Sequence, residues 1–147
     1  FRRLHHQYFG GTDLYYIPFI TPTVEPKFTD RHLKELSPEV NAGIPVVPQL
    51  LSNRSADFIW AAKALQDLGY KEVNLNLGCP SGTVVAKGKG SGFLRDLYAL
   101  ERFLDEFSVP ASTFLFPLRQ DWRANTEEFG DILNLYKKYP LSLLIVH

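Results

Sequence analysis

The sequence predicts an α/β domain built on a parallel β-sheet. Amphipathic helical segments alternate with short apolar segments rich in β-branched and aromatic residues along all 147 residues. Because consecutive strands are separated by a single helix, they are expected to run parallel and to be joined by right-handed crossovers. The predicted strands are almost continuously apolar, which is typical of a sheet that is covered on both faces.

The first third of the chain predicts two helices, each followed by a strand. Residues 1–9 form a short helix that two glycines end, and residues 14–20 form the first strand. Thr29 and Asp30 are the capping residues expected at the start of the second helix. Residues 44–51 form the next strand, whose prolines lie near its ends, where backbone donors are not needed.

The sequence after residue 51 predicts three more helices, each again followed by a strand. Each of these helices begins at a polar capping residue and carries apolar residues at helical spacing. The predicted capping residues are Ser55, Asp96 and Asn125. The predicted strands cover residues 71–77, 111–118 and 143–147.

Two architectures fit this alternation, a doubly wound open sheet and part of a (β/α)8 barrel. Both place ligand-binding residues at the carboxyl ends of the strands. The candidate site residues are therefore those at the predicted strand ends: Gln49, Asn76, Cys79, Arg119 and His147.

Composition argues against several classes of protein. Lys and Arg number 16 and Asp and Glu number 16, so the net charge is zero and a uniformly basic nucleic-acid-binding surface is not expected. The single cysteine cannot form an internal disulfide, so we expect a reducing compartment, the cytoplasm. No apolar run approaches the roughly 20 residues that span a membrane. The four histidines and the cysteine lack the spacing of a metal site.

A glycine-rich segment, residues 82–92, follows the strand that contains Asn76. It lacks the GxxxxGK[ST] pattern of a phosphate-binding loop, and Phe93 stands where a dinucleotide fingerprint needs glycine. Two interpretations remain. The segment is a flexible, solvated basic loop, or it is a mobile lid over the strand ends that turns Lys87 and Lys89 toward an anionic partner.

Cys79 also has two interpretations. A lone cysteine is most often a small buried apolar residue. This one lies in a Gly-Cys-Pro turn directly after a predicted strand and beside the glycine-rich segment. A thiol of ordinary acidity is mostly protonated at neutral pH, so at this position it can donate a proton to a bound substrate.

Three motifs, in this order along the chain, resemble the tRNA-dihydrouridine synthases. They are Pro48-Gln-Leu50, Asn76-Leu-Gly-Cys-Pro80 and Lys87-Gly-Lys-Gly-Ser-Gly-Phe-Leu94. Phe1-Arg2 is similar to a Phe-Arg pair after the family's first strand, and residues 143–147 are similar to its Ile-His strand. The resemblance implies an FMN-dependent (β/α)8 barrel, of which residues 1–147 are the part from the first helix to the sixth strand. It also implies a helical tRNA-binding domain that lies outside this chain.

The reaction implied by this resemblance is reduction of the C5–C6 double bond of a uridine in tRNA. NADPH reduces the flavin, a hydride passes from the flavin to uracil C6, and the cysteine, here Cys79, donates a proton to C5. The target base must leave the RNA stack to reach the flavin. By position, the resemblance assigns Gln49, His147 and Arg119 to the cofactor and Asn76, Lys87 and Lys89 to the substrate, with Asn76 touching the uracil or the flavin edge.

One departure from the family pattern leaves two alternatives. The family has Lys-x-Arg at the end of its next strand, and here Pro117 stands in the lysine position before Arg119. A proline has no charge and no N–H donor. An inactive homologue that binds no flavin is therefore one alternative. The other is a different FMN barrel oxidoreductase, similar to the dihydroorotate dehydrogenases, that acts on a free pyrimidine.

Overall fold

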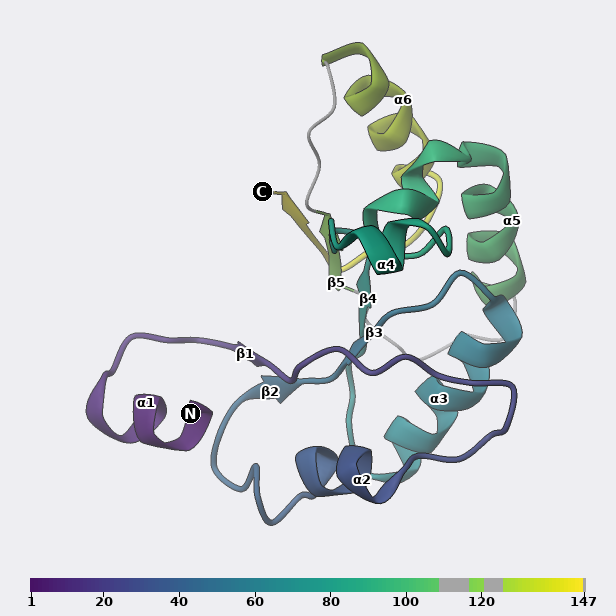
Figure 1. The fold of residues 1–147 in the computed structure, drawn as a ribbon. Coiled ribbons are helices and arrows are strands. Elements are labelled where there is room, and N and C mark those ends of the chain that lie inside the picture. Colours follow the sequence, from purple (N-terminus) through teal and green to yellow (C-terminus); the bar gives the residue numbers. More distant parts are fainter. Residues whose placement is uncertain (109–116, 121–125, 147) are drawn as a thin grey trace.

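A computed structural model describes residues 1–108, 117–120 and 126–146 of the chain, and it describes side chains for residues 1–106 and 129–146 (Figure 1). Within these ranges the helices are α1 (Arg2–Tyr8), α2 (Asp30–Leu36), α3 (Ser55–Asp67), α4 (Gly82–Val85), the 3₁₀-helix η1 (Gly90–Arg95), α5 (Leu97–Ser108) and α6 (Thr126–Tyr136). The strands are β1 (Tyr15–Tyr16), β2 (Val46–Val47), β3 (Gln49–Leu50), β4 (Asn74–Asn76), β5 (Pro117–Gln120) and β6 (Leu143–Val146).

All paired strands run parallel, which confirms the α/β prediction. The larger sheet has the order β3-β4-β5-β6, and β1 pairs with β2. Only Pro48 separates β2 from β3, and a parallel bridge joins Ile20 to Leu50. The segment that begins with β1 therefore continues the sheet beyond β3.

The helices that connect the strands of the larger sheet form one layer. In Figure 1, α3, α5 and α6 lie beside one another on the same side of β3–β6, and α5 packs against both of the other two. The described strands follow one another in chain order without the reversal that marks a doubly wound sheet. This arrangement favours an arc of a barrel, although the strands described here do not close into one.

The hydrophobic core lies between this helix layer and the sheet. Phe58, Ala61 and Leu65 of α3 are buried there, as the helical spacing predicts, together with side chains of the strands and of the other two helices. The other members with almost no exposed surface include Leu50, Leu75, Leu77, Leu100 and Ile132.

Among the predicted helix caps, Thr29 and Asp96 are confirmed, whereas Ser55 and Asp30 lie inside their helices as first residues. The Thr29 hydroxyl accepts a hydrogen bond from the His32 N–H at 3.3 Å, and the Asp96 carboxylate accepts one from the Ala99 N–H at 2.9 Å. Ser55 does not cap α3. It is the first residue inside the helix, and its hydroxyl instead donates to Glu106 on α5, a tertiary partner that local sequence does not show. The predicted cap Asn125 lies outside the described residues.

A proline divides one of the predicted strands. The strand expected over residues 44–51 is split into β2 and β3 because Pro48 has no N–H to donate to the ladder. Most of the strand expected over residues 111–118 lies outside the described residues, and the strand that is described there is β5, Pro117–Gln120. A proline as the first residue of a strand is one of the few positions a sheet tolerates.

Candidate active site

Three buried amide side chains meet where β3 and β4 lie side by side. Side chains alternate between the two faces of a strand. In the strand that contains β4, Leu75 packs into the core beneath the helices, so Asn74 and Asn76 lie on the opposite face. Gln49 of β3 is paired in register with Asn74. All three amides are almost inaccessible to solvent, at 4% for Gln49, 0% for Asn74 and 5% for Asn76.

These amides form a continuous hydrogen-bonded chain. Gln49 donates from Nε2 to Asn74 Oδ1 at 2.7 Å, and Asn76 donates from Nδ2 to Gln49 Oε1 at 2.8 Å. Asn76 Oδ1 in turn accepts two backbone N–H groups, from Gly78 at 3.0 Å and from Cys79 at 2.9 Å. The side chain of Asn76 therefore closes the turn that carries the thiol.

Two of these amides keep hydrogen-bonding capacity for a ligand. An amide nitrogen has two N–H groups, and an amide oxygen has two lone pairs. Within the described residues, Gln49 uses one of each, so one N–H and one lone pair remain. Asn76 uses both lone pairs and one N–H, so it retains a donor only.

Cys79 lies at the edge of this network and is half-buried. Its N–H is held by Asn76, and its carbonyl oxygen accepts hydrogen bonds from the N–H and the hydroxyl of Ser91, both at 3.1 Å. The turn is thus fixed from both sides, by β4 and by η1. The interpretation of Cys79 as a buried apolar residue is not supported, because its side chain is partly open to solvent.

The glycine-rich segment, which the sequence predicts as a flexible loop or a mobile lid, has regular secondary structure. It forms α4, a turn and η1, and it packs closely against the Cys79 turn. Gly90 has a φ of +56°, and a Cβ at this position would lie 2.6 Å from the Cys79 carbonyl oxygen. A Cβ at Gly92 would lie 2.6 Å from the Val85 carbonyl oxygen. These glycines serve close backbone packing rather than mobility.

The two lysines of this segment lie in the turn between α4 and η1. The Asn53 side chain donates to the Lys87 carbonyl oxygen at 3.0 Å and so ties this turn to the loop before α3. Partial burial lowers the pKa of the Lys89 ammonium, and the carboxylate of Asp57 opposes that shift. The Asp57 carboxylate also pairs with Arg54 at 3.5 Å. Lys87 remains exposed to solvent.

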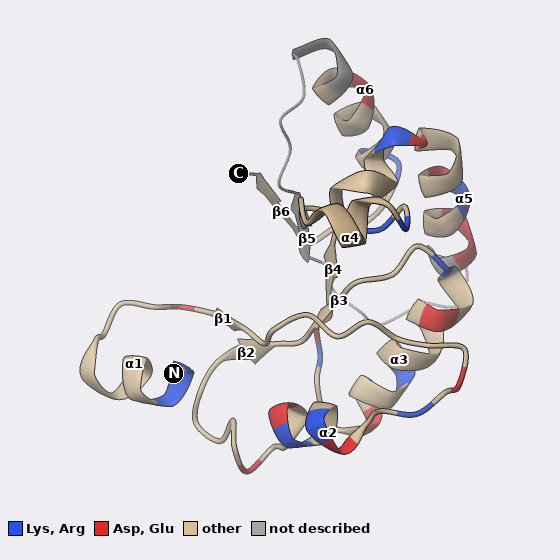
Figure 2. Ribbon diagram, viewed as in Figure 1, with Lys and Arg blue, Asp and Glu red and all other residues tan. Residues whose placement is uncertain are grey.

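Away from this turn, positively and negatively charged residues are mixed along several helices. Figure 2 shows residues of both signs interspersed along α2, α3 and α5. The turn after α4 contributes the positive charge of Lys87 and Lys89, and η1, which follows this turn, is hydrogen-bonded to the Cys79 turn. This local distribution agrees with a zero net charge and leaves a small basic region beside the candidate site.

The remaining predicted site residues are placed only in part. Arg119 of β5 is the backbone partner of Asn76 in β4, so its position in the sheet adjoins the amide network. Its side chain lies outside the described residues, and so does the whole of His147. Gln49, Asn76 and Cys79 are thus brought together by the fold, and Arg119 lies next to them along the sheet.

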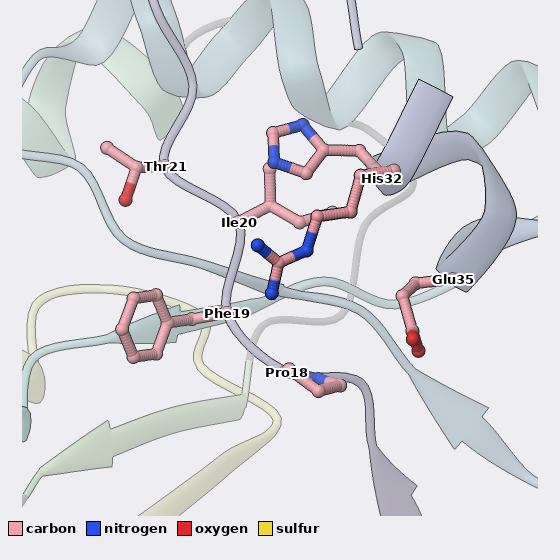
Figure 3. A pocket seen from close by; sticks show the side chains of 7 residues that line it. Pro18, Phe19, Ile20, Thr21, His32 and Glu35 are labelled. Carbon is pink, nitrogen blue, oxygen red and sulfur yellow. The ribbon is translucent and has the colours of Figure 1, made fainter. Parts of the chain in front are cut away.

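A hollow of about 280 Å³ lies elsewhere, between the segment after β1 and helix α2 (Figure 3). Residues 18–21 line one side, and Arg31, His32 and Glu35 line the other. None of the predicted site residues borders it. In the described ranges there is no group of three or more His, Cys, Asp or Glu side chains that could hold a metal, and no helix there is long and apolar enough to cross a membrane.

Asn74 and Ser91 are contacts of the site that the sequence analysis missed. The alternation Asn74-Leu-Asn76 carried the signal for the first, because polar residues two apart on a buried strand share a face. Ser91 carried no such signal, because its contact with Cys79 depends on how η1 folds back on the turn.

Comparison with known proteins gives a consistent result. The chain matches the dihydrouridine synthase family over residues 1–137. It is 23% identical to a probable tRNA-dihydrouridine synthase of Rhodobacter capsulatus over 113 residues, which are 74% of this chain and 34% of that protein. It is also 38% identical to a probable tRNA-dihydrouridine synthase of Staphylococcus epidermidis over 50 residues. These residues are 34% of this chain and 15% of the Staphylococcus protein. The matched residues thus cover about a third of the length of the Rhodobacter protein and 15% of the length of the Staphylococcus protein. Because the family match covers nearly all of its residues, the chain belongs to the dihydrouridine synthase family.

Proposed function

We propose that the protein containing this chain reduces a uridine in tRNA to dihydrouridine, with Cys79 as the proton donor. The observation that carries this proposal is the Cys79 turn, which Asn76 closes at the end of β4 in a chain of the dihydrouridine synthase family. The half-buried thiol can meet a substrate, and its backbone is held on both sides so that its position is reproducible.

The amide network fits a flavin at this end of the sheet. The edge of an isoalloxazine ring carries carbonyl oxygens and ring nitrogens, which accept or donate hydrogen bonds. Gln49 retains one donor and one acceptor, so it can pair with such an edge, and Asn76 retains a donor. We assign Gln49, Arg119 and His147 to FMN, in a (β/α)8 barrel that residues 1–147 form in part. When bound and reduced by NADPH, FMN supplies the hydride for uracil C6.

The chain's own residues supply the proton and the geometry. The Cys79 thiol gives its proton to C5 of the uracil as the C5–C6 double bond becomes a single bond, and the resulting thiolate regains a proton from solvent. The Asn76 amide holds the turn and offers its remaining N–H to the uracil or to the flavin edge. Lys87 and Lys89 neutralise phosphates of the tRNA backbone next to the site.

The whole protein is proposed to have a further domain and a defined compartment. A helical tRNA-binding domain is proposed to follow the barrel. The cytoplasm is the proposed compartment, because tRNA is found there and because its reducing conditions keep the Cys79 thiol free.

The test uses the longest native form of the protein and its Cys79→Ala variant. Both are examined for flavin absorbance after desalting and for dihydrouridine formation in tRNA with NADPH. We expect both proteins to retain flavin and the variant to lose at least about 100-fold in rate, as is typical when a general acid is removed. Undiminished reduction by the variant would exclude Cys79 as the acid. Reduction of free orotate in preference to tRNA would favour an enzyme acting on free pyrimidines.

Pro117 favours one competing function, that of a homologue that binds no flavin. The residue cannot supply the charge that a lysine supplies at this position of the family pattern. A colourless native protein that takes up no added FMN would support this alternative. The variant Pro117→Lys then tests the cause, because recovered flavin binding would assign the defect to this one residue.

A further inference from the structure

We propose that Asn74 is a positioning residue, which holds the Gln49 amide in the orientation that Asn76 sets and so keeps the remaining hydrogen-bonding groups of Gln49 in place for a ligand. Asn74 is fully buried, so its side chain acts through its neighbours. The identity of the ligand, FMN, rests on the proposed function. The orienting role of Asn74 does not require FMN, because it follows from the contacts among Gln49, Asn74, Asn76 and the Cys79 turn.

The direction of the amide chain is set at the turn. Backbone N–H groups can only donate, so Gly78 and Cys79 require an oxygen from the Asn76 side chain. This requirement turns Asn76 Nδ2 toward Gln49, which must then present Oε1 to it. Gln49 Nε2 is left facing Asn74, whose side chain meets it with Oδ1.

Asn74 locks this arrangement from the other end. If the Gln49 amide rotated by half a turn, its oxygen would face Asn74 Oδ1 and its nitrogen would face Asn76 Nδ2, which brings like groups together at both contacts. Water cannot rescue either contact, because all three side chains are buried. The register of β3 and β4, which pairs Gln49 with Asn74, keeps the two groups adjacent.

The fixed orientation of the Gln49 amide matters because Gln49 is the residue that faces a ligand. In the observed orientation, Gln49 has one Nε2–H and one Oε1 lone pair left, each on a defined side of the amide. Without an acceptor at position 74, the Gln49 amide loses the partner that holds Nε2, and its free groups are no longer fixed before a ligand arrives. Pre-formed donors and acceptors bind a ligand more tightly than groups that must be ordered on binding.

The experiment compares two variants of the full-length protein. Asn74→Leu removes the acceptor but keeps the number and branching of the side-chain heavy atoms, whereas Asn74→Asp keeps an oxygen toward Gln49 Nε2. Two quantities are measured for each: the Kd for FMN, from quenching of flavin fluorescence, and the side-chain NH₂ signals of Gln49 in ¹⁵N-glutamine-labelled protein without flavin. The Gln49 signals are assigned by their loss in Gln49→Glu.

We expect Asn74→Leu to raise the Kd by about tenfold or more, the effect of losing one buried hydrogen bond, and to shift the Gln49 signals. Asn74→Asp should stay within about threefold of the native Kd and leave these signals near their native positions. Equal weakening by both variants, or unshifted Gln49 signals in folded Asn74→Leu, would overturn the proposal. If Asn74→Leu does not fold, Asn74→Ala takes its place with the same expectations.

The two readouts separate this inference from the proposed function. A native protein that binds no FMN contradicts the proposed cofactor, whereas the NMR comparison still decides whether Asn74 orients Gln49. Native FMN binding with unshifted Gln49 signals in the folded variant contradicts the role of Asn74 alone.

Discussion

Replacing Gly90 with alanine should strongly destabilise the segment that holds the Cys79 turn. The added Cβ would lie 2.6 Å from the Cys79 carbonyl oxygen, 3.0 Å from Cys79 Cβ and 3.0 Å from Val84 Cγ1. The first of these contacts is with backbone, which cannot move aside without breaking the hydrogen bonds from Ser91. The positive φ of Gly90, +56°, adds a conformational cost for any residue with a side chain.

The expected loss follows from three contributions. The left-handed conformation costs alanine roughly 1–2 kcal/mol, and overpacking costs about 1–3 kcal/mol. The lower chain entropy of the unfolded state returns about 0.4–1 kcal/mol. Gly90→Ala should therefore lower the free energy of unfolding by about 2–4 kcal/mol.

Two nearby glycines provide matched controls. Gly88 also has a positive φ, +62°, but a Cβ at this position would make only an ordinary contact of 3.4 Å with the Asn53 side chain, so Gly88→Ala should cost about 1 kcal/mol. Gly82 begins α4 with open space around it, and Gly82→Ala should be neutral or stabilising by up to about 1 kcal/mol. The three variants thus separate close packing, backbone strain and simple glycine replacement.

Urea unfolding followed by circular dichroism measures these differences, and hydrogen exchange of a peptide covering residues 79–93 reports on the turn itself. We expect faster exchange of the Ser91 N–H, which is bonded to the Cys79 carbonyl oxygen, in Gly90→Ala only. A Gly90→Ala protein that is no less stable than Gly88→Ala would refute the predicted clash with the Cys79 turn.

Two further predictions concern contacts around the site and the core. Asn53→Ala removes the 3.0 Å hydrogen bond to the Lys87 carbonyl oxygen. Tryptic cleavage after Lys87 should become faster, while the free energy of unfolding should fall by only about 0.5–1.5 kcal/mol. An unchanged cleavage rate would argue against this hydrogen bond as a restraint on the turn. Tyr136 is buried, and its hydroxyl has no hydrogen-bonding partner among the described residues, so Tyr136→Phe should leave stability unchanged or raise it by up to about 1 kcal/mol. Burial raises the pKa of the Tyr136 phenol, so this residue's contribution is complete below the ordinary pKa of about 10 and is lost as the pH rises above it. The native protein should therefore lose stability above about pH 10 more steeply than Tyr136→Phe in parallel urea titrations, and equal slopes would contradict this assignment.

The parallel α/β arrangement could be predicted from the sequence because it depends on periodicity and on the order of elements. The caps Thr29 and Asp96 were predictable for the same reason, since the capping contact lies within three residues. Ser55 was misassigned because its hydroxyl is taken by Glu106, a residue far along the chain. The split of one predicted strand at Pro48 was visible in the sequence as a missing donor.

The sequence indicated that Gln49, Asn76 and Cys79 would lie near one another, but not how they are connected. Gln49, Asn76 and Cys79 stand at predicted strand ends, where α/β folds place their ligands. That Asn76 holds the Cys79 turn, and that Asn74 holds Gln49, depends on the register of β3 against β4, which residue types alone do not specify. The regular structure of the glycine-rich segment was not predictable, because glycines permit both irregular loops and close packing, and the close packing depends on the contacts at Gly90 and Gly92.

The two backbone N–H groups on Asn76 Oδ1 also bear on the choice of base. Because both lone pairs are occupied, a ligand that reaches this amide meets an N–H group only. A ring carbonyl accepts from that group, whereas an exocyclic amino group places one donor against another. Uracil and cytosine have nearly the same outline and differ at C4 by this exchange of an acceptor for a donor. At this position, hydrogen-bond polarity rather than shape would tell the two pyrimidines apart.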